Sequence, residues 1–378
     1  MTAMGGVAMG GADAARRCRG GSRLIQRSRG GNGALVPAER RALTAAVEEA
    51  MGKEAWVAQE MVEVWAEDRH FAKGLMAAGA TQVRAWERVG GSEGEAGRLW
   101  QCLAALGAPL YRARFALPGP SHWRALWVVD EAPASHFDAL RDTALSLAPW
   151  APMAVVARTG RGFHGRFGRA WQAAPGNLHL CAVAPVQVAA AAAASAPMLG
   201  VVATQEGLER VAQGAWRARI KWINDVLVDG AKVAGTLTAA QVHGEGMGRL
   251  LFGIGVNVAH APLVPRSRCV PRVGSLAQVG EVSLGAVLWE ILASLGRWMA
   301  VWAEGGGVRL HAAYVAATEV IGQRVVLWPD AAGGPEEPRV PLASGVLEAI
   351  LPDLSLRISG HVRPFGQGRL MVLDDGSG

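Results

Sequence analysis

The stretch from Lys221 to Val258 constrains the fold of this chain more than any other part of the sequence. Two apolar runs, Ile220 to Val228 and Lys232 to Thr238, flank the dipeptide Asp229-Gly230. An Asp-Gly pair between two such runs is a strong short-range signal for a tight β-hairpin. A further strand is expected at Leu250 to Val258, so the stretch predicts neighbouring strands of one sheet.

Polar side chains interrupt these otherwise apolar strands. Lys221, Asn224, Asp225, Lys232 and Asn257 stand among Trp, Ile, Val and Leu. Burying an unpaired polar group is costly, so residues of this kind on core strands favour a ligand site. We expect several of them to face a bound molecule.

Two glycines, Gly253 and Gly255, lie inside the third expected strand. Glycine within a strand often marks a place where a ligand or another backbone comes close. The alternative is a core hairpin with a bulge, which the glycines alone do not exclude.

A second informative stretch runs from Thr159 to Trp171 and is rich in glycine and arginine. Its glycines allow the backbone to fold closely around a ligand, and Arg161, Arg166 and Arg169 carry permanent positive charge. The segment itself contains no acidic residue, so its cations repel one another. We expect a loop that stays mobile until an anion binds.

Three ordered blocks in this sequence resemble those of the biotin protein ligases. They read Lys-Trp-Ile-Asn-Asp from Lys221, Lys-Val-Ala-Gly-Thr-Leu from Lys232 and Gly-Ile-Gly-Val-Asn-Val from Gly253. The family usually has Pro where this chain has Ile223. The glycine–arginine segment is similar to the family's adenylate-binding loop, and Pro175 to Leu178 is similar to its Pro-Gly-Asn-Leu turn. Lipoate ligases belong to the same superfamily but usually lack the Trp of the first block and the Gly-Ile-Gly block.

The resemblance implies an ATP-dependent, Mg²⁺-requiring enzyme that forms biotinyl-5′-AMP and transfers biotin to a lysine of a biotin carboxyl carrier domain of a carboxylase. The catalytic residues it implies are Lys232, Arg166 and Arg161. The ligand-binding residues it implies are Ser135, Gly165, Arg169, Trp171, Asn177, Lys221, Trp222, Asn224, Asp225, Gly235, Leu237, Gly253, Gly255 and Asn257. No protein-bound structural metal is expected.

Two parts of the site depart from the family pattern. Aligning the loop from Trp171 backwards places Arg166 on the central loop arginine, whereas aligning it from Gly160 favours Arg161. The family's Asp-Ser-Thr-Asn segment, whose hydroxyls bind the biotin head, is replaced here by residues 130–135, in which Ser135 is the candidate hydroxyl. The Gln that usually precedes the loop is missing.

The sequence predicts an α+β fold. We expect a basic tail at 1–33, a helical appendage at 34–107, a catalytic domain at 108–318 and a C-terminal domain at 319–378. The resemblance implies a mixed sheet with helices, similar to class II aminoacyl-tRNA synthetases, for the catalytic domain and a small SH3-like barrel for the last domain. The appendage is expected to contain helices at Arg40 to Met51, Ala55 to Ala77 and Gly94 to Leu106. A further amphipathic helix is expected at Leu284 to Ala303, and strands are expected at Ile321 to Leu327, Gly345 to Leu351, Leu354 to Ile358 and Gly368 to Leu373.

Composition narrows the function further. Hydrophobic residues make up 51% of the 378 residues and charged residues 19%, an ordinary globular balance. No apolar run reaches membrane-spanning length without Gly, charge or Pro, and the four cysteines lack metal-ligand spacing.

The helical appendage is acidic and tryptophan-bearing where a DNA-reading helix would be basic. We therefore expect a cytoplasmic monomer or homodimer that binds neither membrane nor specific DNA. A lipoate or octanoate ligase and a biotin-sensing DNA-binding regulator are the alternatives.

The tail at 1–33 is predicted to be dispensable. It holds six arginines and one acid, which supplies +5 of the formal net charge of +6, and it has too little apolar surface to order itself. A chain beginning at Leu35 should keep its rate of adenylate formation. A rate loss of more than about tenfold, roughly 1.4 kcal/mol in the barrier, would show that the tail contributes to the site.

Overall fold

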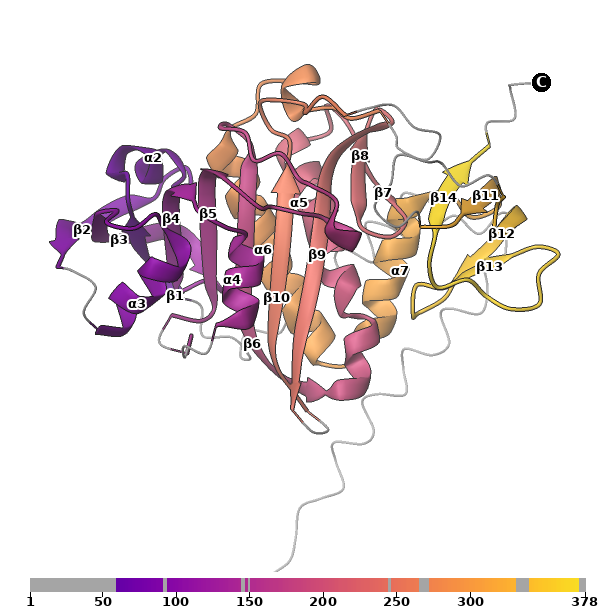
Figure 1. Cartoon of the computed structure of the whole chain (residues 1–378), viewed down its shortest axis with the longest axis horizontal. Coiled ribbons are helices and arrows are strands. Elements are labelled where there is room, and N and C mark those ends of the chain that lie inside the picture. The colour runs from indigo at the N-terminus through magenta and orange to yellow at the C-terminus, as the bar shows by residue number, and fades with distance from the viewer. Residues whose placement is uncertain are drawn as a thin grey trace, which may run out of the picture. The chain divides into compact units, whose positions relative to one another are not determined.

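A mixed ten-stranded β-sheet forms the centre of the computed structural model (Figure 1). The structure describes residues 59–373 except 91–93, 144–146, 149, 244–245, 265–271 and 331–339. The strand order is β2-β3-β1-β4-β5-β6-β10-β9-β8-β7. Strands β1, β4 and β5 pair in parallel, and the other neighbours are antiparallel. The fold is therefore α+β, as the sequence predicted.

The strands of this sheet are β1 (Gln59–Ala66), β2 (Thr81–Val89), β3 (Leu110–Ser121), β4 (Ala125–Ala132), β5 (Met153–Gly160), β6 (Leu178–Ala189), β7 (Ala218–Lys221), β8 (Asp225–Val228), β9 (Ala231–His243) and β10 (Gly246–Val256). The helices are α2 (Arg69–Gly74), α3 (Gly94–Leu103), α4 (His136–Asp142), α5 (Ala196–Ala212), α6 (Leu284–Ala303) and α7 (Gly307–Thr318).

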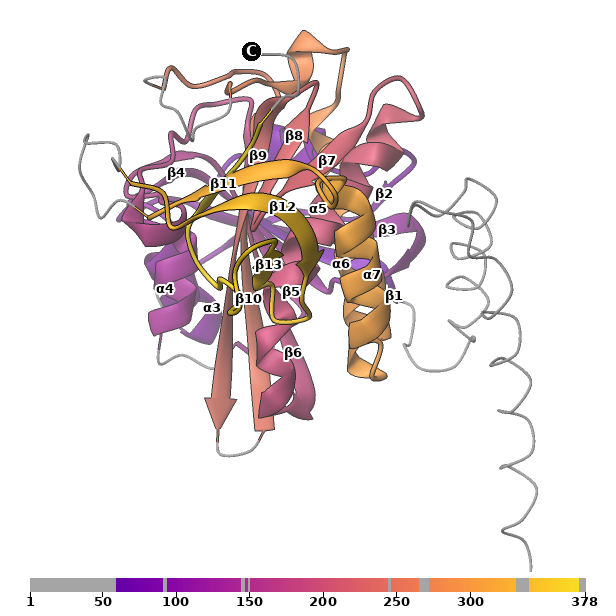
Figure 2. The same ribbon diagram turned by 90° about the vertical axis from the view of Figure 1, so that its right-hand side faces the viewer.

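Helices cover both faces of the sheet, α3 and α4 on one and α5, α6 and α7 on the other (Figure 2). Side chains of the central strands alternate between two cores for this reason. On β4, Leu126 and Val128 join the core beneath α5 and α6, whereas Trp127 joins the core beneath α3 and α4. In the second core the rings of Trp65 and Trp127 stack with their centroids 4.9 Å apart. Burial on both faces makes these strands almost continuously apolar.

The predicted helical appendage at 34–107 is wrong in part, because among its described residues 59–66 and 81–89 are strands of the large sheet. Residues 59–66 form β1, an interior strand between β3 and β4, instead of part of a helix from Ala55 to Ala77. Val62 and Val64 are fully buried on one face and Trp65 on the other, so the strand lacks the alternation that identifies a half-buried strand. The helix at Gly94 is confirmed, ending at Leu103, and the helix expected at Arg40 to Met51 lies outside the described residues.

The hairpin predicted at Asp229-Gly230 is confirmed. Asp229 has φ 48° and Gly230 φ 71°, and they join β8 to β9, which pair antiparallel. The run from Ile220 to Val228, however, is two strands, β7 and β8, because the chain turns at residues 222–224. Ile223 is therefore in a turn, after a cis Trp222–Ile223 peptide bond, and not in a strand.

Helix α6 occupies the range that the sequence predicted, Leu284–Ala303. It is long and apolar enough to pass a length-and-composition test for a membrane span, but 61% of its most apolar window is buried inside the structure. It packs against α5, and the indole of Trp298 donates to the Glu206 carboxylate of that helix. Helix α6 is therefore a core helix of this fold.

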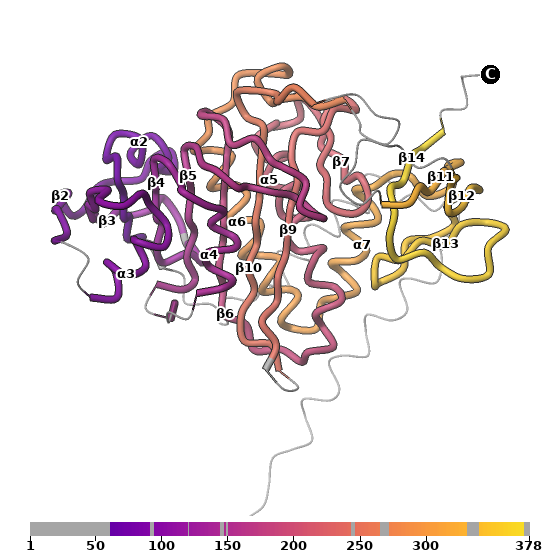
Figure 3. The backbone as a smooth tube through the Cα atoms, viewed as in Figure 1, coloured from indigo at the N-terminus to yellow at the C-terminus, as the bar shows by residue number. Residues whose placement is uncertain are grey.

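A second sheet follows α7, with the strand order β13-β12-β11-β14 (Figure 3). Its strands are β11 (Arg324–Trp328), β12 (Ala343–Ile350), β13 (Leu356–Ile358) and β14 (Arg369–Val372). The Trp222 indole donates to the Leu354 carbonyl at 2.8 Å, so this sheet contacts the turn that separates β7 from β8. The sequence predicted strands in each of these places.

Close packing of α5 on α6 is predicted to depend on Gly207. A Cβ at this position would lie 2.8 Å from both the Cα and the N of Ile291, so the helices would have to separate. Gly207→Ala should lower the free energy of unfolding by about 1–3 kcal/mol, measured by denaturant titration. Gly307→Ala at the start of α7 is the control, because a Cβ there meets no atom within 4 Å. Equal stability of the two variants would contradict this account.

Candidate functional site

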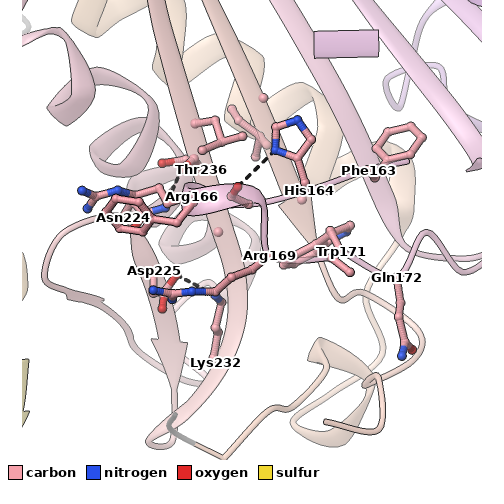
Figure 4. A pocket seen from close by; sticks show the side chains of 18 of the residues that line it. Phe163, His164, Arg166, Arg169, Trp171, Gln172, Asn224, Asp225, Lys232 and Thr236 are labelled. Carbon is pink, nitrogen blue, oxygen red and sulfur yellow. Dashed lines mark hydrogen bonds and ion pairs between the residues drawn. The ribbon is translucent and has the colours of Figure 1, made fainter. Parts of the chain in front are cut away.

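A cavity of about 380 Å³ lies where the residue 163–171 segment passes over β8, β9 and β10 (Figure 4). Its size is within the range of small-molecule sites. Most of the site residues proposed from sequence line it. These are Ser135, Gly165, Arg166, Arg169, Trp171, Lys221, Trp222, Asn224, Asp225, Lys232, Gly235, Leu237, Gly253, Gly255 and Asn257.

The turn at residues 222–224 is fixed from three directions. The Trp222 indole donates to Leu354 O, and the Tyr314 hydroxyl of α7 donates to Ile223 O at 2.9 Å. The Asn224 amide donates to Thr236 O of β9 at 2.6 Å. Since the turn is held by its own side chains and by neighbouring elements, Asp225 enters the cavity at a defined position.

Lys232 and Asp225 form an ion pair at the cavity wall. Lys232 Nζ lies 2.7 Å from Asp225 Oδ1, and their side chains are 25% and 20% exposed. A Cβ at Gly235 would lie 3.5 Å from both of these atoms, at ordinary contact distance, so the pair lies directly over this glycine. Lys232 Nζ also lies 5.9 Å from the centroid of the Trp171 ring. The lysine is thus a half-buried cation inside the cavity rather than a solvated hairpin residue.

The glycines of β10 accommodate two aromatic side chains of the protein itself. A Cβ at Gly255 would lie 2.5 Å from the Trp171 ring, and a Cβ at Gly253 would lie 3.1 Å from Phe137. Both glycines also line the cavity, so the expectation that a ligand comes close to these backbones stays a prediction. Trp171 and Phe137 pack there, and both also line the cavity.

The glycine–arginine segment forms a small hairpin. Gly165 N donates to Arg169 O at 2.7 Å and Trp171 N to Phe163 O at 2.9 Å, with His164 bridged to Ala170. The tip at residues 166–168 has positive φ at Phe167 and Gly168. Arg166 and Arg169 line the cavity, and Figure 4 shows Arg169 beside Asp225 and Lys232.

Arg161 lies outside the cavity, which corrects its place among the catalytic candidates. Its side chain is 81% exposed and pairs with Glu131 Oε1 at 3.2 Å. Acids elsewhere in the chain also pair with Arg158 and Arg169, so the arginines are less unbalanced than the segment's own composition suggests. The arrangement agrees with the alignment from Trp171, in which Arg166 is the loop arginine that faces the cavity.

Two residues that replace loop glycine and arginine have structural roles. The Phe163 ring packs between the buried rings of His136 and His179. His164 Nε2 lies 2.6 Å from Asp138 Oδ2 of α4, and its pKa is raised by the hydrogen bond to Gly165 O and by Asp138. Burial lowers the pKa of His136 to about 4, so this ring is neutral near pH 7. The hairpin is therefore attached to the cavity floor and to α4.

Asn177 is a structural residue and does not line the cavity, which corrects its assignment as a ligand-binding residue. Its amide donates to His260 O at 2.8 Å, and its Oδ1 accepts from the backbone N–H groups of Ala259 and His260, each at 3.0 Å. The side chain is 2% exposed. It therefore ties the start of β6 to the segment after β10.

Sequence reasoning missed several residues of the cavity. His136 and His179 contribute to the floor, and Asp330, Gly368 and Arg369 come from the C-terminal sheet. Asp330 Oδ1 lies 3.3 Å from Arg169 Nη2. No local motif marks Asp330 or Arg369, because the arginine that they accompany is far away in the sequence. Ser135, by contrast, was foreseen, and its buried hydroxyl also caps α4 by accepting from Asp138 N.

Among the described residues, no group of three or more His, Cys, Asp or Glu side chains is arranged to hold a metal ion. Five permanent cations line the cavity together with two carboxylates, so the lining carries a formal excess of three positive charges. The cations are Arg166, Arg169, Lys221, Lys232 and Arg369, and the carboxylates are Asp225 and Asp330. Phe137, Phe163 and Leu237 give the same cavity an apolar part. Such a site suits an anionic ligand with an apolar body.

The chain is similar to several known proteins. Residues 137–257 match the biotin/lipoate A/B protein ligase family. A biotin–[acetyl-CoA-carboxylase] ligase of Paracoccus denitrificans is 31% identical over 198 residues, which span 50% of this chain and 81% of that protein. The bifunctional ligase/repressor BirA of Bacillus subtilis is 30% identical over 109 residues, 29% of this chain and 33% of that protein. A solved biotin protein ligase of Aquifex aeolicus aligns with a TM-score of 0.48 and 18% identity, over 66% of this chain and 98% of that one.

The chain belongs to the biotin/lipoate protein ligase family, within its biotin protein ligase group. The resemblance of its three sequence blocks to this family is thereby confirmed.

The structural role of Asn177 gives a prediction. Asn177→Ala would leave the N–H groups of Ala259 and His260 without their acceptor and should lower the free energy of unfolding by about 1–3 kcal/mol. Asn177→Asp keeps both accepting contacts and should recover part of the loss. Asn224→Ala, which removes one hydrogen bond in the cavity, is the control and should change stability less. Denaturant unfolding curves of the three variants measure these differences in stability. An unchanged curve for Asn177→Ala would contradict the structural role of Asn177.

Proposed function

We propose that this chain is an ATP-dependent biotin–protein ligase. It forms biotinyl-5′-AMP from biotin and ATP, then transfers the biotinyl group to a lysine of a biotin carboxyl carrier domain. The observation that carries the proposal is the half-buried Lys232 beside Arg166 and Arg169 at the apolar cavity. Biotin has an apolar chain that ends in a carboxylate, and the α-phosphate of ATP must bind next to that carboxylate for the two to react.

The first step requires two anions to react with each other. An oxygen of the biotin carboxylate attacks the α-phosphorus of ATP, a P–O bond to pyrophosphate breaks, and pyrophosphate leaves. Fixed cations offset the repulsion between carboxylate and phosphate and stabilise the charge that develops on the phosphoryl oxygens. We assign this role to Lys232 and Arg166, which line the cavity, with Asp225 holding the lysine in position.

The second step uses the carrier lysine as the nucleophile. Its neutral amine attacks the carbonyl carbon of the mixed anhydride, the bond to the phosphate oxygen breaks, AMP leaves with the electron pair, and the nitrogen releases one proton to solvent as the amide forms. Water would compete with the amine, so the intermediate needs a covered site. The hairpin at residues 163–171 lies over the cavity and supplies that cover.

Mg²⁺ would enter this reaction with ATP. Mg²⁺ is usually held by one or two carboxylates together with substrate phosphates. Asp225 and Asp330 are the carboxylates of the described cavity lining, and both already pair with a cation, Lys232 and Arg169. The donor set therefore fits an ion held mainly by the nucleotide, and Mg²⁺ would neutralise phosphate charge.

The remaining assignments follow from the same proposal. We assign the four-stranded sheet to an SH3-like domain at 319–378, and the large sheet to a catalytic domain similar to class II aminoacyl-tRNA synthetases. Support for a cytoplasmic location is the ATP requirement and, within the described residues, the free thiols Cys102 and Cys181. The protein would act as a monomer or homodimer and without specific DNA binding. The carrier domain of an acetyl-CoA carboxylase is the proposed protein substrate.

Replacing Lys232 tests the proposed chemistry. Lys232→Ala removes a charge-assisted contact worth about 1.5–3 kcal/mol, so adenylate formation should fall about tenfold or more. Lys232→Arg should rescue poorly, because a planar guanidinium does not reproduce a compact ammonium between two oxygens. Lys73→Ala is the matched control, since Lys73 is an exposed lysine of α2.

The measurement is pyrophosphate release with ATP, Mg²⁺ and one acid at a time, alongside a thermal melt of each variant. Biotin should support release, whereas lipoate and octanoate should not. Release with lipoate or octanoate alone would establish the related acyl ligase instead. Unchanged release by Lys232→Ala with an intact melt would remove this lysine from the mechanism.

A further inference from the structure

One carboxylate of the C-terminal sheet lies between two arginines at the cavity. Asp330 Oδ1 lies 3.3 Å from Arg169 Nη2 and 4.0 Å from Arg369 Nε. Its second oxygen accepts from Gly368 N at 2.9 Å. The side chains of Asp330 and Arg369 are each 17% exposed, whereas that of Arg169 is 48% exposed. This group therefore connects the tip of the 163–171 hairpin to the second sheet.

The C-terminal sheet holds its part of the group rigidly. Arg369 begins β14 and is paired with Trp328, the last residue of β11, while Asp330 follows two residues later. The hydrogen bond from Gly368 N fixes the Asp330 carboxylate against the start of β14. Arg169, in contrast, directly follows a hairpin tip whose backbone is irregular. Asp330 is thus a fixed point to which Arg169 is attached.

The charges of this group are not balanced. Asp330 is shared by two guanidinium groups, and Asp225 and Arg166 also act electrostatically on Arg169. The pKa of Arg169 is lowered by burial and then by Arg369. Arg369 Nε is buried without a hydrogen-bond partner among the described residues. Two guanidinium groups around one carboxylate at the cavity wall favour the binding of a further anion there.

We propose that Asp330 is a positioning residue, which sets Arg169 and Arg369 side by side so that they bind the phosphate chain of the nucleotide. The proposal rests on the proposed function, because it names the groups that would hold the ATP phosphates in that same site. It makes the C-terminal sheet part of the nucleotide site. Arg369 contacts the nucleotide directly, and Asp330 acts through the arginines.

Whether Asp330→Asn weakens or strengthens ATP binding distinguishes a positioning role from simple electrostatic repulsion. A carboxylate in a phosphate site repels the ligand, so its removal alone would strengthen ATP binding. A carboxylate that positions two arginines has the opposite effect, because its loss releases Arg169 from the cavity. Asp330→Asn should therefore weaken ATP binding by about tenfold, with the KM for biotin changed by less than about twofold.

Arg369→Ala should also weaken ATP binding by about tenfold or more, since it removes a direct charge-assisted contact. The matched controls are Arg357→Ala and Glu348→Gln, exposed residues of β13 and β12 outside the cavity lining. In the double variant, Asp330→Asn with Arg169→Ala, the Asp330 change should cost clearly less ATP affinity than the tenfold that it costs in the wild-type chain, because only the positioning of Arg369 is left to lose. That result shows that Asp330 acts through Arg169.

The experiment measures binding of ATP with Mg²⁺ by calorimetry and KM values by pyrophosphate release, on the full chain. Tighter or unchanged ATP binding by a folded Asp330→Asn variant overturns the positioning role. Because binding is measured without turnover, the result stands even if the wild-type chain releases no pyrophosphate with biotin. Absence of that release would count against the proposed function and not against the phosphate site.

Discussion

The register between β8 and β9 is the constraint on which the site depends. It sets Asp225 opposite Gly235, and the Lys232 side chain reaches back over that glycine to the Asp225 carboxylate. A slip of one residue would turn the side chains of one strand to the other face of the sheet and would separate the two charges. The tight turn at Asp229-Gly230 fixes the pairing of Leu227 with Lys232, and a register shift between Val226 and Leu227 then sets Asp225 opposite Gly235. A local turn thus determines the position of a lysine inside a cavity.

The parts of the fold that sequence predicted correctly are those with local causes. The Asp229-Gly230 turn and the helix at Leu284–Ala303 are encoded by neighbouring residues, through turn chemistry and apolar periodicity. Strand β1 was assigned to a helix because its partners, β3 and β4, are distant in sequence and because its two faces are buried in the two cores. The break between β7 and β8 has a similar origin. Tyr314 and Leu354, both from elements much later in the chain, hold that turn.

The site shows the same division between local and distant information. The three blocks identified the cavity walls, because each block is a continuous stretch of strand or turn. The loop was harder, because spacing alone cannot decide whether Arg161 or Arg166 faces inward. The bridge between His164 and Ala170 decides it by folding the segment into a hairpin whose tip carries Arg166. Asp330 and Arg369 have no local signature, and only the packing of the second sheet brings them to the cavity.

The anchoring of the hairpin limits how the cavity can close. Phe163 is packed between two buried histidine rings at one end, and Trp171 lies against the bare backbone of Gly255 at the other. Moving either aromatic ring would leave buried apolar surface unfilled, which is costly in a close-packed interior. The tip at residues 166–168 has no comparable packing, and none of its residues is buried. Closure over a ligand is therefore expected to be a movement of the tip about fixed ends. Because Arg166 is at that tip and Arg169 directly follows it, such a movement changes the positions of the cations while the aromatic wall stays in place.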